Sequence, residues 1–420
     1  MGKIITIVFL IVFCISGFSQ ERFLQYTSKD TINGKPKVKG SFGVNLKLNG
    51  YYDLFGGLQN SETFNVGAIN VFGTDDSGSL KIDMYQTQMN LESSFMTKNG
   101  KEINAVVEFD FWGGNGHMRL RKAYVAIDNW LIGQNWVAFG DKELWPNIME
   151  YEGPPSGVWV RSPQISYYHT FKNKAWHYSL SLTAPITDYN KYGEAAEALI
   201  IEPLIIEANQ TTPDFMAAVK YQKKWGHLRL STVVRNVKYI DNNETDRFMG
   251  YGFSFSGIYW MHKDSFQFQI TGGEGISAYN TSVQGFGYDG YPTTRNQIKA
   301  TPSFGGWASY ELFYSPKFHS NFVLGFTQYS LNNVKRVVVY DVIDSGLIIE
   351  KGNLDNYHYY GIVNLMYDPF ENMIVGVELD YGEKKMSFDG SLDGTFETIS
   401  IDASKARDAM RISFGILYNF

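Results

Sequence analysis

Apolar and polar residues alternate along most of the chain, with the two-residue period of a β-strand that has one apolar and one wetted face. In residues 411–420, for example, Phe414, Ile416 and Tyr418 lie on one face, and the other face carries mostly small or polar residues, Ser413, Gly415 and Asn419. Similar runs predict about sixteen strands, each near the roughly 9–11 residues that cross a bilayer at a tilt. These strands are expected near residues 44–55, 83–97, 102–112, 119–128, 131–139, 163–171, 176–184, 213–222, 226–238, 248–261, 264–273, 303–314, 320–331, 355–367, 371–383 and 407–420.

The connections between these strands alternate between long and short. Long loops are expected at 56–82, 140–162, 185–212, 274–302, 332–354 and 384–406, with shorter ones on the same side at 113–118 and 239–247. Tight turns follow every other strand, which is typical of outer-membrane barrels with short periplasmic turns and longer extracellular loops. Because an unpaired edge in lipid leaves backbone groups unsatisfied, the last strand must pair with the first. The pattern therefore predicts an all-β fold, a transmembrane antiparallel β-barrel of about sixteen strands.

Composition agrees with a membrane barrel and suggests export. Aromatic residues make up 16% of the 420 residues, charged residues only 19%, and the mean hydropathy is −0.23. Residues 1–19 have the features of a cleaved secretory signal, whose apolar run from Ile4 to Ile15 is too short to span a bilayer. We expect a periplasmic spacer at 20–40 and the barrel at 41–420. The one cysteine, Cys14, lies in the signal, so disulfides and zinc–thiolate sites are not expected in the mature chain.

Residues with catalytic or metal-binding spacing are not evident. The seven histidines show no HExxH or other close ligand spacing, and the serines of GFSFSG at 252–257 do not fit a nucleophile elbow. We therefore expect no catalytic residue, no metal and no cofactor, and nothing indicates a nucleic-acid partner. Two alternatives to a channel remain open: a barrel enzyme that hydrolyses lipids, and a surface adhesin or ligand-binding barrel that uses its long loops.

Four short motifs occur in order between residues 121 and 164. They are Arg121-x-Ala123-Tyr124-Val125, Gly133-Gln134-x-Trp136, Glu152-Gly153-Pro154-Pro155 and Arg161-x-Pro163-Gln164. This set resembles the DcaP-like family of trimeric outer-membrane porins, and with the strand pattern the resemblance spans residues 41–420. The chain departs from the family around GDKELWPN at 140–147, where a Met-Asp-Pro run is more usual, and its spacer is too short for the coiled-coil extension of some members.

The resemblance implies a homotrimer in the outer membrane of a Gram-negative bacterium, in contact with lipid and lipopolysaccharide. It also implies passive diffusion of small hydrophilic solutes, favouring small anions such as dicarboxylates. The final aromatic-x-Phe, ending at Phe420, resembles the signal by which the barrel-assembly machinery receives outer-membrane proteins.

The third loop, near 140–162, is expected to fold inward and constrict the pore, because prolines stiffen it and glycine allows a sharp bend. The loop-shaping candidates are Gly153, Pro154, Pro155 and Pro163. The basic candidates for the pore wall are Lys122, Arg161, Arg229, Arg235 and Arg411. The acidic candidates that would face them are Glu108, Asp110, Asp141, Glu143, Glu150 and Glu152. For Arg121, alternation predicts an outward side chain, which would place it at a subunit interface unless a bulge intervenes.

Overall fold

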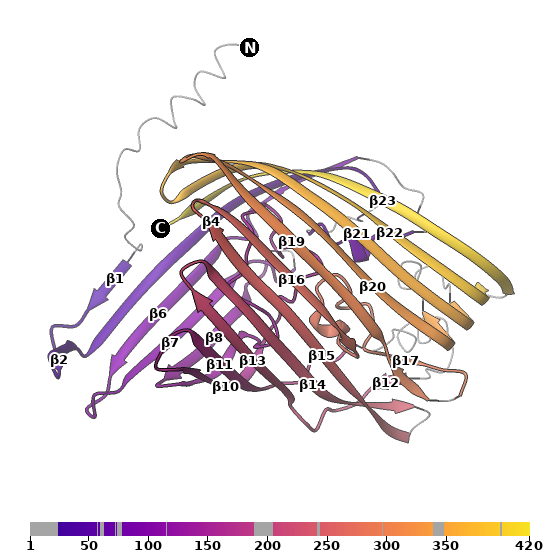
Figure 1. Ribbon diagram of the computed structural model, residues 1–420, viewed down its shortest axis with the longest axis horizontal. Helices are drawn as coiled ribbons and strands as arrows, with labels where there is room; N and C mark the ends of the chain where they lie inside the picture. The colour runs from indigo at the N-terminus through magenta and orange to yellow at the C-terminus, as the bar shows by residue number, and fades with distance from the viewer. Residues whose placement is uncertain are drawn as a thin grey trace, which may run out of the picture.

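Sixteen antiparallel strands close into a barrel in the computed structural model (Figure 1). The structure describes residues 24–56, 58, 63–71, 73, 78–114, 116–188, 205–241, 244–295, 297–338, 348–394 and 397–420. The wall strands, in order around the barrel, are β4 (Val38–Phe55), β6 (Gln88–Met96), β7 (Glu102–Asp110), β8 (Arg119–Ile127), β9 (Trp130–Trp136), β10 (Arg161–Thr170), β11 (Trp176–Thr183), β13 (Asp214–Lys223), β14 (Gly226–Asp241), β15 (Glu244–Met261), β16 (Asp264–Glu274), β19 (Pro302–Ser315), β20 (Phe318–Val338), β21 (Ile348–Phe370), β22 (Met373–Gly394) and β23 (Glu397–Asn419). Each expected strand corresponds to one of these, so the predicted fold class is confirmed.

The last strand, β23, pairs with the first, β4, as predicted. Ile412 lies opposite Tyr52, and Tyr418 lies opposite Leu46. Beyond the end of β23, the Phe420 carbonyl accepts a hydrogen bond from the Val44 amide at 2.7 Å, and the Phe420 amide donates one back at 2.9 Å. The chain end is therefore part of the seam, which leaves no open sheet edge at this point in the lipid.

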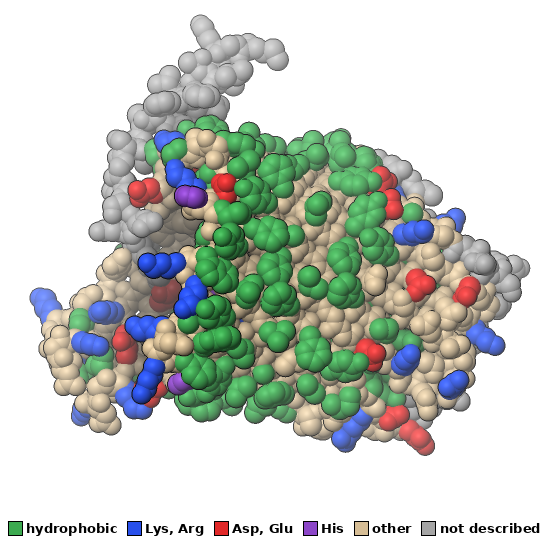
Figure 2. All heavy atoms as spheres, viewed as in Figure 1, with side chains coloured by type: hydrophobic (Ala, Val, Ile, Leu, Met, Phe, Trp, Pro, Cys, Tyr) green, Lys and Arg blue, Asp and Glu red, His purple; other side chains and the backbone are tan. Residues whose placement is uncertain are grey.

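Side chains alternate between the outer face and the interior along these strands. On β23, Phe414 is 40% exposed on the outside, whereas Arg411 is 1% exposed on the inside. Figure 2 shows the outcome on one face, a broad band of hydrophobic side chains with charged groups at both ends. This band matches the apolar zone that a barrel presents to hydrocarbon. Among the described residues, no helix is long and apolar enough to cross a membrane.

Two of the expected long connections and one of the shorter ones are largely strand instead. β20 extends to Val338 and β21 begins at Ile348. β22 ends at Gly394 and β23 begins at Glu397, while β14 ends at Asp241 and β15 begins at Glu244. The loops predicted at 332–354, 384–406 and 239–247 are therefore wrong over most of their length. The inward residues Leu331, Val334, Leu354 and Phe388 are buried in a hydrophobic cluster with the inner loops, which stabilises these strands beyond the apolar band.

The N-terminal part of the described chain adds a short extension to the wall. β1 (Leu24–Thr27) pairs with the start of β4, and β2 (Thr31–Ile32) pairs with β3 (Lys35–Pro36). β4 begins at Val38, slightly before the expected start of the barrel at residue 41. The predicted signal peptide lies outside the described residues.

Three connections fold into the barrel and bury an apolar core there. They contribute the 3-10 turns η2 (Val66–Ala68) and η3 (Ser277–Tyr279), the small ladder β17 (Gly290–Pro292) with β18 (Ile298–Ala300), and the segment 137–160. Two short strands flank the wall: β5 (Ser79–Asp83) pairs with β4, and β12 (Ile205–Glu207) pairs with β14. The lumen is thus narrowed by packed loops whose positions are set by contacts with the wall.

Candidate pore and constriction loop

The connection between β9 and β10, residues 137–160, is called the constriction loop below. Its midpoint is held by Glu378 of β22, whose carboxylate accepts hydrogen bonds from the amides of Met149 and Glu150, both at 2.8 Å. Close to this contact, Lys47 Nζ of β4 donates to the Met149 carbonyl at 2.6 Å, and β4 and β22 lie on either side of the closing strand β23. The loop begins after β9 and ends before β10, and β6, β7 and β8 separate β9 from β4 along the wall. Because its midpoint is held at β4 and β22, the loop crosses the interior of the barrel.

Glutamine side chains and a backbone carbonyl of the wall hold the two arms of the loop. Gln269 Oε1 of β16 accepts from the Val158 amide at 2.9 Å, and Ser156 Oγ donates to the Gly306 carbonyl of β19 at 2.9 Å. The Trp145 amide donates to Gln267 Oε1, also at 2.9 Å. These hydrogen bonds offset the cost of burying backbone polar groups that would otherwise be unsatisfied.

The predicted EGPP turn is a tight bend within this loop. Gly153 has φ +75°, a left-handed conformation that favours glycine, and Pro154 and Pro155 are buried. The Pro154 carbonyl accepts from Trp159 Nε1 at 3.4 Å. Pro163 does not belong to the loop: it lies in β10 opposite Gln134 with its side chain exposed. Its predicted loop-shaping role is corrected on this ground.

Glu108 and Asp110 of β7 are neutralised by cations of the next strand. Arg121 donates to Glu108 at 2.8 Å and to Asp110 at 2.9 Å, and Lys122 contacts Glu108 at 2.7 Å. Arg119 also pairs with Asp110 at 2.7 Å. The β7–β8 register shifts between Glu108 and Phe109, so Arg121 turns inward and the bulge alternative holds for this residue.

At the start of the constriction loop, Asp141 and Glu143 also have partners. Asp141 accepts from His227 Nε2 at 2.9 Å and from Ser256 Oγ at 2.8 Å. Burial alone would raise the pKa of Asp141, but His227, Arg229 and Ser256 more than offset it and lower the pKa to about 2. Glu143 pairs with Lys220 of β13 at 2.5 Å.

The last two acidic candidates differ from one another. Glu150 is buried and accepts from the Phe64 amide at 2.7 Å and from the Glu152 amide at 3.1 Å. The Glu152 side chain has no hydrogen-bond or ion-pair partner within the described part of the chain. Burial and the neighbouring Glu150 raise the pKa of Glu152 to about 7, although Arg119 and Arg161 oppose the shift.

Two of the five basic candidates lie in closed clusters. Arg235 is 1% exposed and pairs with Asp289 at 2.8 Å and Asp214 at 3.2 Å. Arg411 is equally buried, pairs with Asp53 at 2.6 Å and lies 4.2 Å from the centre of the Tyr51 ring. This burial argues against the predicted role of either arginine as a free pore-lining cation.

Arg161 and Arg229 are half-buried, and each keeps one buried nitrogen that no described residue satisfies. The Arg161 guanidinium lies 4.7 Å from the centre of a Trp136 ring, and its Nη1 has no hydrogen-bond partner in the described chain. Arg229 Nη2 donates to the Ala138 carbonyl, while its Nη1 likewise lacks a described partner. Both groups lie next to the constriction loop.

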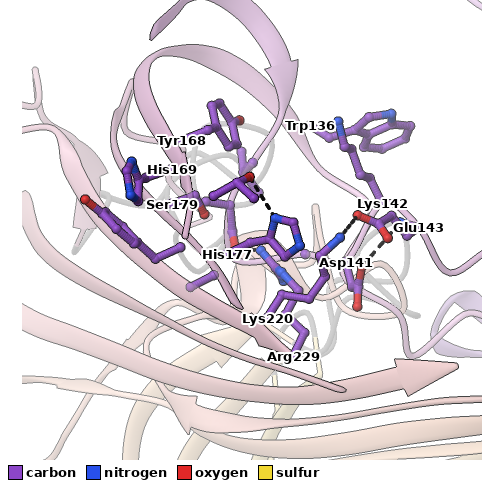
Figure 3. A pocket seen from close by; sticks show the side chains of 16 residues that line it. Trp136, Asp141, Lys142, Glu143, Tyr168, His169, His177, Ser179, Lys220 and Arg229 are labelled. Carbon is purple, nitrogen blue, oxygen red and sulfur yellow. Dashed lines mark hydrogen bonds and ion pairs between the residues drawn. The ribbon is translucent and has the colours of Figure 1, made fainter. Parts of the chain in front are cut away.

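A residue that the sequence did not single out, Lys142, is the one lysine or arginine of the constriction loop. It borders a cavity of about 260 Å³ beside Lys220 and Arg229 (Figure 3), and a second of about 330 Å³ beside Lys47 and Arg121. Lys142 is exposed and has no hydrogen-bond or ion-pair partner among the described residues. Partial desolvation by the neighbouring protein atoms lowers the pKa of Lys142, as do the nearby cations, while Glu143 opposes the shift.

Alternation could have identified Lys47 and Lys220, because both occupy wetted positions on strands. Lys142 lies in an irregular loop, where a two-residue period carries no information about direction. Four tryptophans line the same region, with successive ring centres of Trp136, Trp145, Trp159 and Trp307 at 6.1, 4.7 and 6.0 Å. Within the described chain, no group of three or more His, Cys, Asp or Glu residues could hold a metal ion.

Comparison with solved structures identifies the fold. The outer-membrane channel DcaP of Acinetobacter baumannii has a TM-score of 0.71 at 16% identity, over 94% of this chain and 99% of that one. An anion-selective porin from Comamonas acidovorans has a TM-score of 0.56 at 10% identity, over 91% and 100%. The trimer form of OmpT from Vibrio cholerae has a TM-score of 0.51 at 9% identity, over 91% and 99%.

At the level of sequence, no curated protein matches the chain. The family model of the DcaP outer membrane protein matches residues 18–403, which is most of the chain. That span includes the constriction loop and fifteen complete wall strands, and β23 begins within it. The chain therefore belongs to the DcaP outer membrane protein family and is located in the outer membrane.

Proposed function

We propose that this outer-membrane porin passes small hydrophilic solutes by diffusion and favours small anions such as dicarboxylates. The observation that carries the anion preference is an imbalance of partners around the constriction loop. Five of the six acidic candidates accept hydrogen bonds or form ion pairs, whereas Lys142 has no described partner and Arg161 and Arg229 keep an unsatisfied donor.

A permeating ion is attracted most strongly by charged groups of the pore that have no partner of opposite charge. An acid already paired with arginine or lysine presents little net field, while an unpaired cation attracts an anion at contact. Of the groups bordering the second cavity, Lys47, Arg121 and Lys142 are basic and Glu150 is acidic. Both observations support a local field that favours anions, although the whole sequence has a formal net charge of −6.

The proposed assembly is a homotrimer surrounded by outer-membrane lipid and lipopolysaccharide. The trimer form of the structurally similar OmpT supports this assembly by analogy. The exposed apolar band supports contact with lipid, and the role of Phe420 in the seam suits a C-terminal strand that the barrel-assembly machinery engages. The contributions of lipopolysaccharide and of that machinery are part of the proposal.

Planar-bilayer recording tests the channel and its selectivity together. We expect stable conductance, inserted in steps of three, and a reversal potential in a KCl gradient that indicates preferential permeation of chloride. Replacing Arg161 or Arg229 by Ala should lower this preference, since each change removes a half-buried positive charge beside the constriction loop. Absence of conductance contradicts the porin, whereas conductance with no preference, or with a preference for cations, contradicts only the anion proposal.

A further inference from the structure

An apolar hollow lies on the outer wall over β11 and β13, at the end of the barrel with the short turns. Its volume is about 570 Å³, and its lining includes Phe171, Trp176, Leu180, Ala217 and Val219. The four large side chains among these are between 42% and 47% exposed. They surround the small Ala217 and form a concave site on the side of the wall that faces hydrocarbon.

Two lysine-bearing turns border this hollow. Residues 171–176 read FKNKAW and residues 222–226 read QKKWG, which gives four lysines and no acidic residue. The turns are neighbours, because the Gln222 amide donates to the Ala175 carbonyl at 2.8 Å. All four lysines are exposed.

One of these lysines is tied directly to the wall of the hollow. Lys223 Nζ lies 5.5 Å from the centre of the Tyr221 ring, and that ring lies 4.7 Å from the ring of Trp176. Tyrosine and tryptophan favour the depth of lipid headgroups, and lysine extends its amine toward the same layer. The hollow therefore has an apolar floor at acyl-chain depth and amines at headgroup depth.

We propose that this hollow binds an anionic glycerophospholipid of the periplasmic leaflet. An acyl chain would lie over Ala217 between Trp176 and Leu180, and the phosphate would contact Lys172, Lys174 and Lys223. Charge complementarity selects this occupant: four uncompensated amines match a headgroup with net negative charge better than a zwitterionic one.

Native mass spectrometry of the mature protein in detergent, with dioleoyl-phosphatidylglycerol and dioleoyl-phosphatidylethanolamine as probes, tests the site. The mature protein without substitutions should retain phosphatidylglycerol in preference to phosphatidylethanolamine. The double variant Lys172→Gln/Lys174→Gln should weaken that binding by roughly 25-fold at low ionic strength, since each lysine near an anionic surface contributes about fivefold. A matched double variant at other exposed short turns, Lys98→Gln/Lys263→Gln, should leave it within about twofold.

A second variant tests the apolar floor independently. Ala217→Trp should fill the hollow and weaken binding of phosphatidylglycerol, whereas Ala308→Trp, an outward alanine on β19, should not. Unchanged single-channel conductance in both variants shows that the barrel has folded. Equal binding of the two lipids, or no effect of the Lys172/Lys174 replacement, overturns the proposal. Loss of the oligomer in Ala217→Trp with lipid binding intact assigns the hollow to an interface between copies and also overturns it.

Discussion

Replacing Lys142 by Gln removes the cation that borders both cavities next to the constriction loop. In this variant the neighbouring Lys220 stays paired with Glu143, so it does not take over the role. An anion in contact with an amine at about 4 Å gains about 1 kcal/mol in a water-like medium and about 4 kcal/mol near a protein surface. The wet but protein-walled lumen lies between these limits, and salt screens part of the interaction. We therefore expect the chloride-to-potassium permeability ratio to fall by about fivefold or more at low salt.

The assay is the reversal potential of single channels in a KCl gradient, compared among three variants. Lys142→Arg keeps the charge and should resemble the native channel. Glu143→Gln releases Lys220 from its ion pair and should increase the anion preference. The reasoning is refuted if Lys142→Gln leaves the reversal potential unchanged, or if Glu143→Gln shifts it in the same direction as Lys142→Gln.

Three further outcomes are expected. Glu378→Ala removes the carboxylate that holds two amides of the constriction loop, so single-channel conductance should rise or become noisy, and a steady native value would contradict the anchoring role. The pKa of Glu152 is about 7, so acidification from pH 8 to 6 neutralises an acid in the lumen and should raise the anion preference; Glu152→Gln should lack that increment when its reversal potential is measured over the same range. Arg411→Ala leaves Asp53 buried without its partner and should destabilise the barrel by about 3–5 kcal/mol, seen as a lower unfolding temperature on heated gels, whereas an unchanged transition would mean that the pair adds nothing.

The sequence was sufficient to predict the wall because one physical constraint repeats in every strand. Lipid outside and a polar interior impose the same period of two, and each of the expected strands corresponds to an observed one. The pattern wrongly predicts loops at 332–354 and 384–406, where β20 to β23 extend beyond the apolar band. There the outer face meets water instead of lipid, so residues such as Asp355 and Lys351 remove the apolar signal while the backbone ladder continues.

For the candidate site, the sequence predicted only which side chains on regular strands point inward and which point outward. Alternation placed Glu108 and Asp110 inside, but the bulge that turns Arg121 toward them depends on how β7 and β8 pair, which the pattern of one strand does not give. The ion-pair partners could not be predicted from the sequence either, because ion pairs join residues that are far apart along the chain. Arg411 and Asp53 are 358 positions apart and meet only because the barrel closes.

Arg229 and Arg235 show why charge in a lumen cannot be assigned from the strand pattern alone. They lie six residues apart on β14, and both point inward with the same signal in the sequence. Arg235 lies where the loops after β11 and β16 converge, and Asp214, Asp289 and backbone carbonyls satisfy its guanidinium. Arg229 lies beside the start of the constriction loop, where Asp141 is already bonded to His227 and Ser256, so one of its nitrogens stays without a described partner. The inner loops therefore determine which charged side chains of the wall are neutralised within the protein and which can interact with a solute. For this reason we expect selectivity to respond strongly to Arg229 and Lys142, and stability to respond strongly to Arg235 and Arg411.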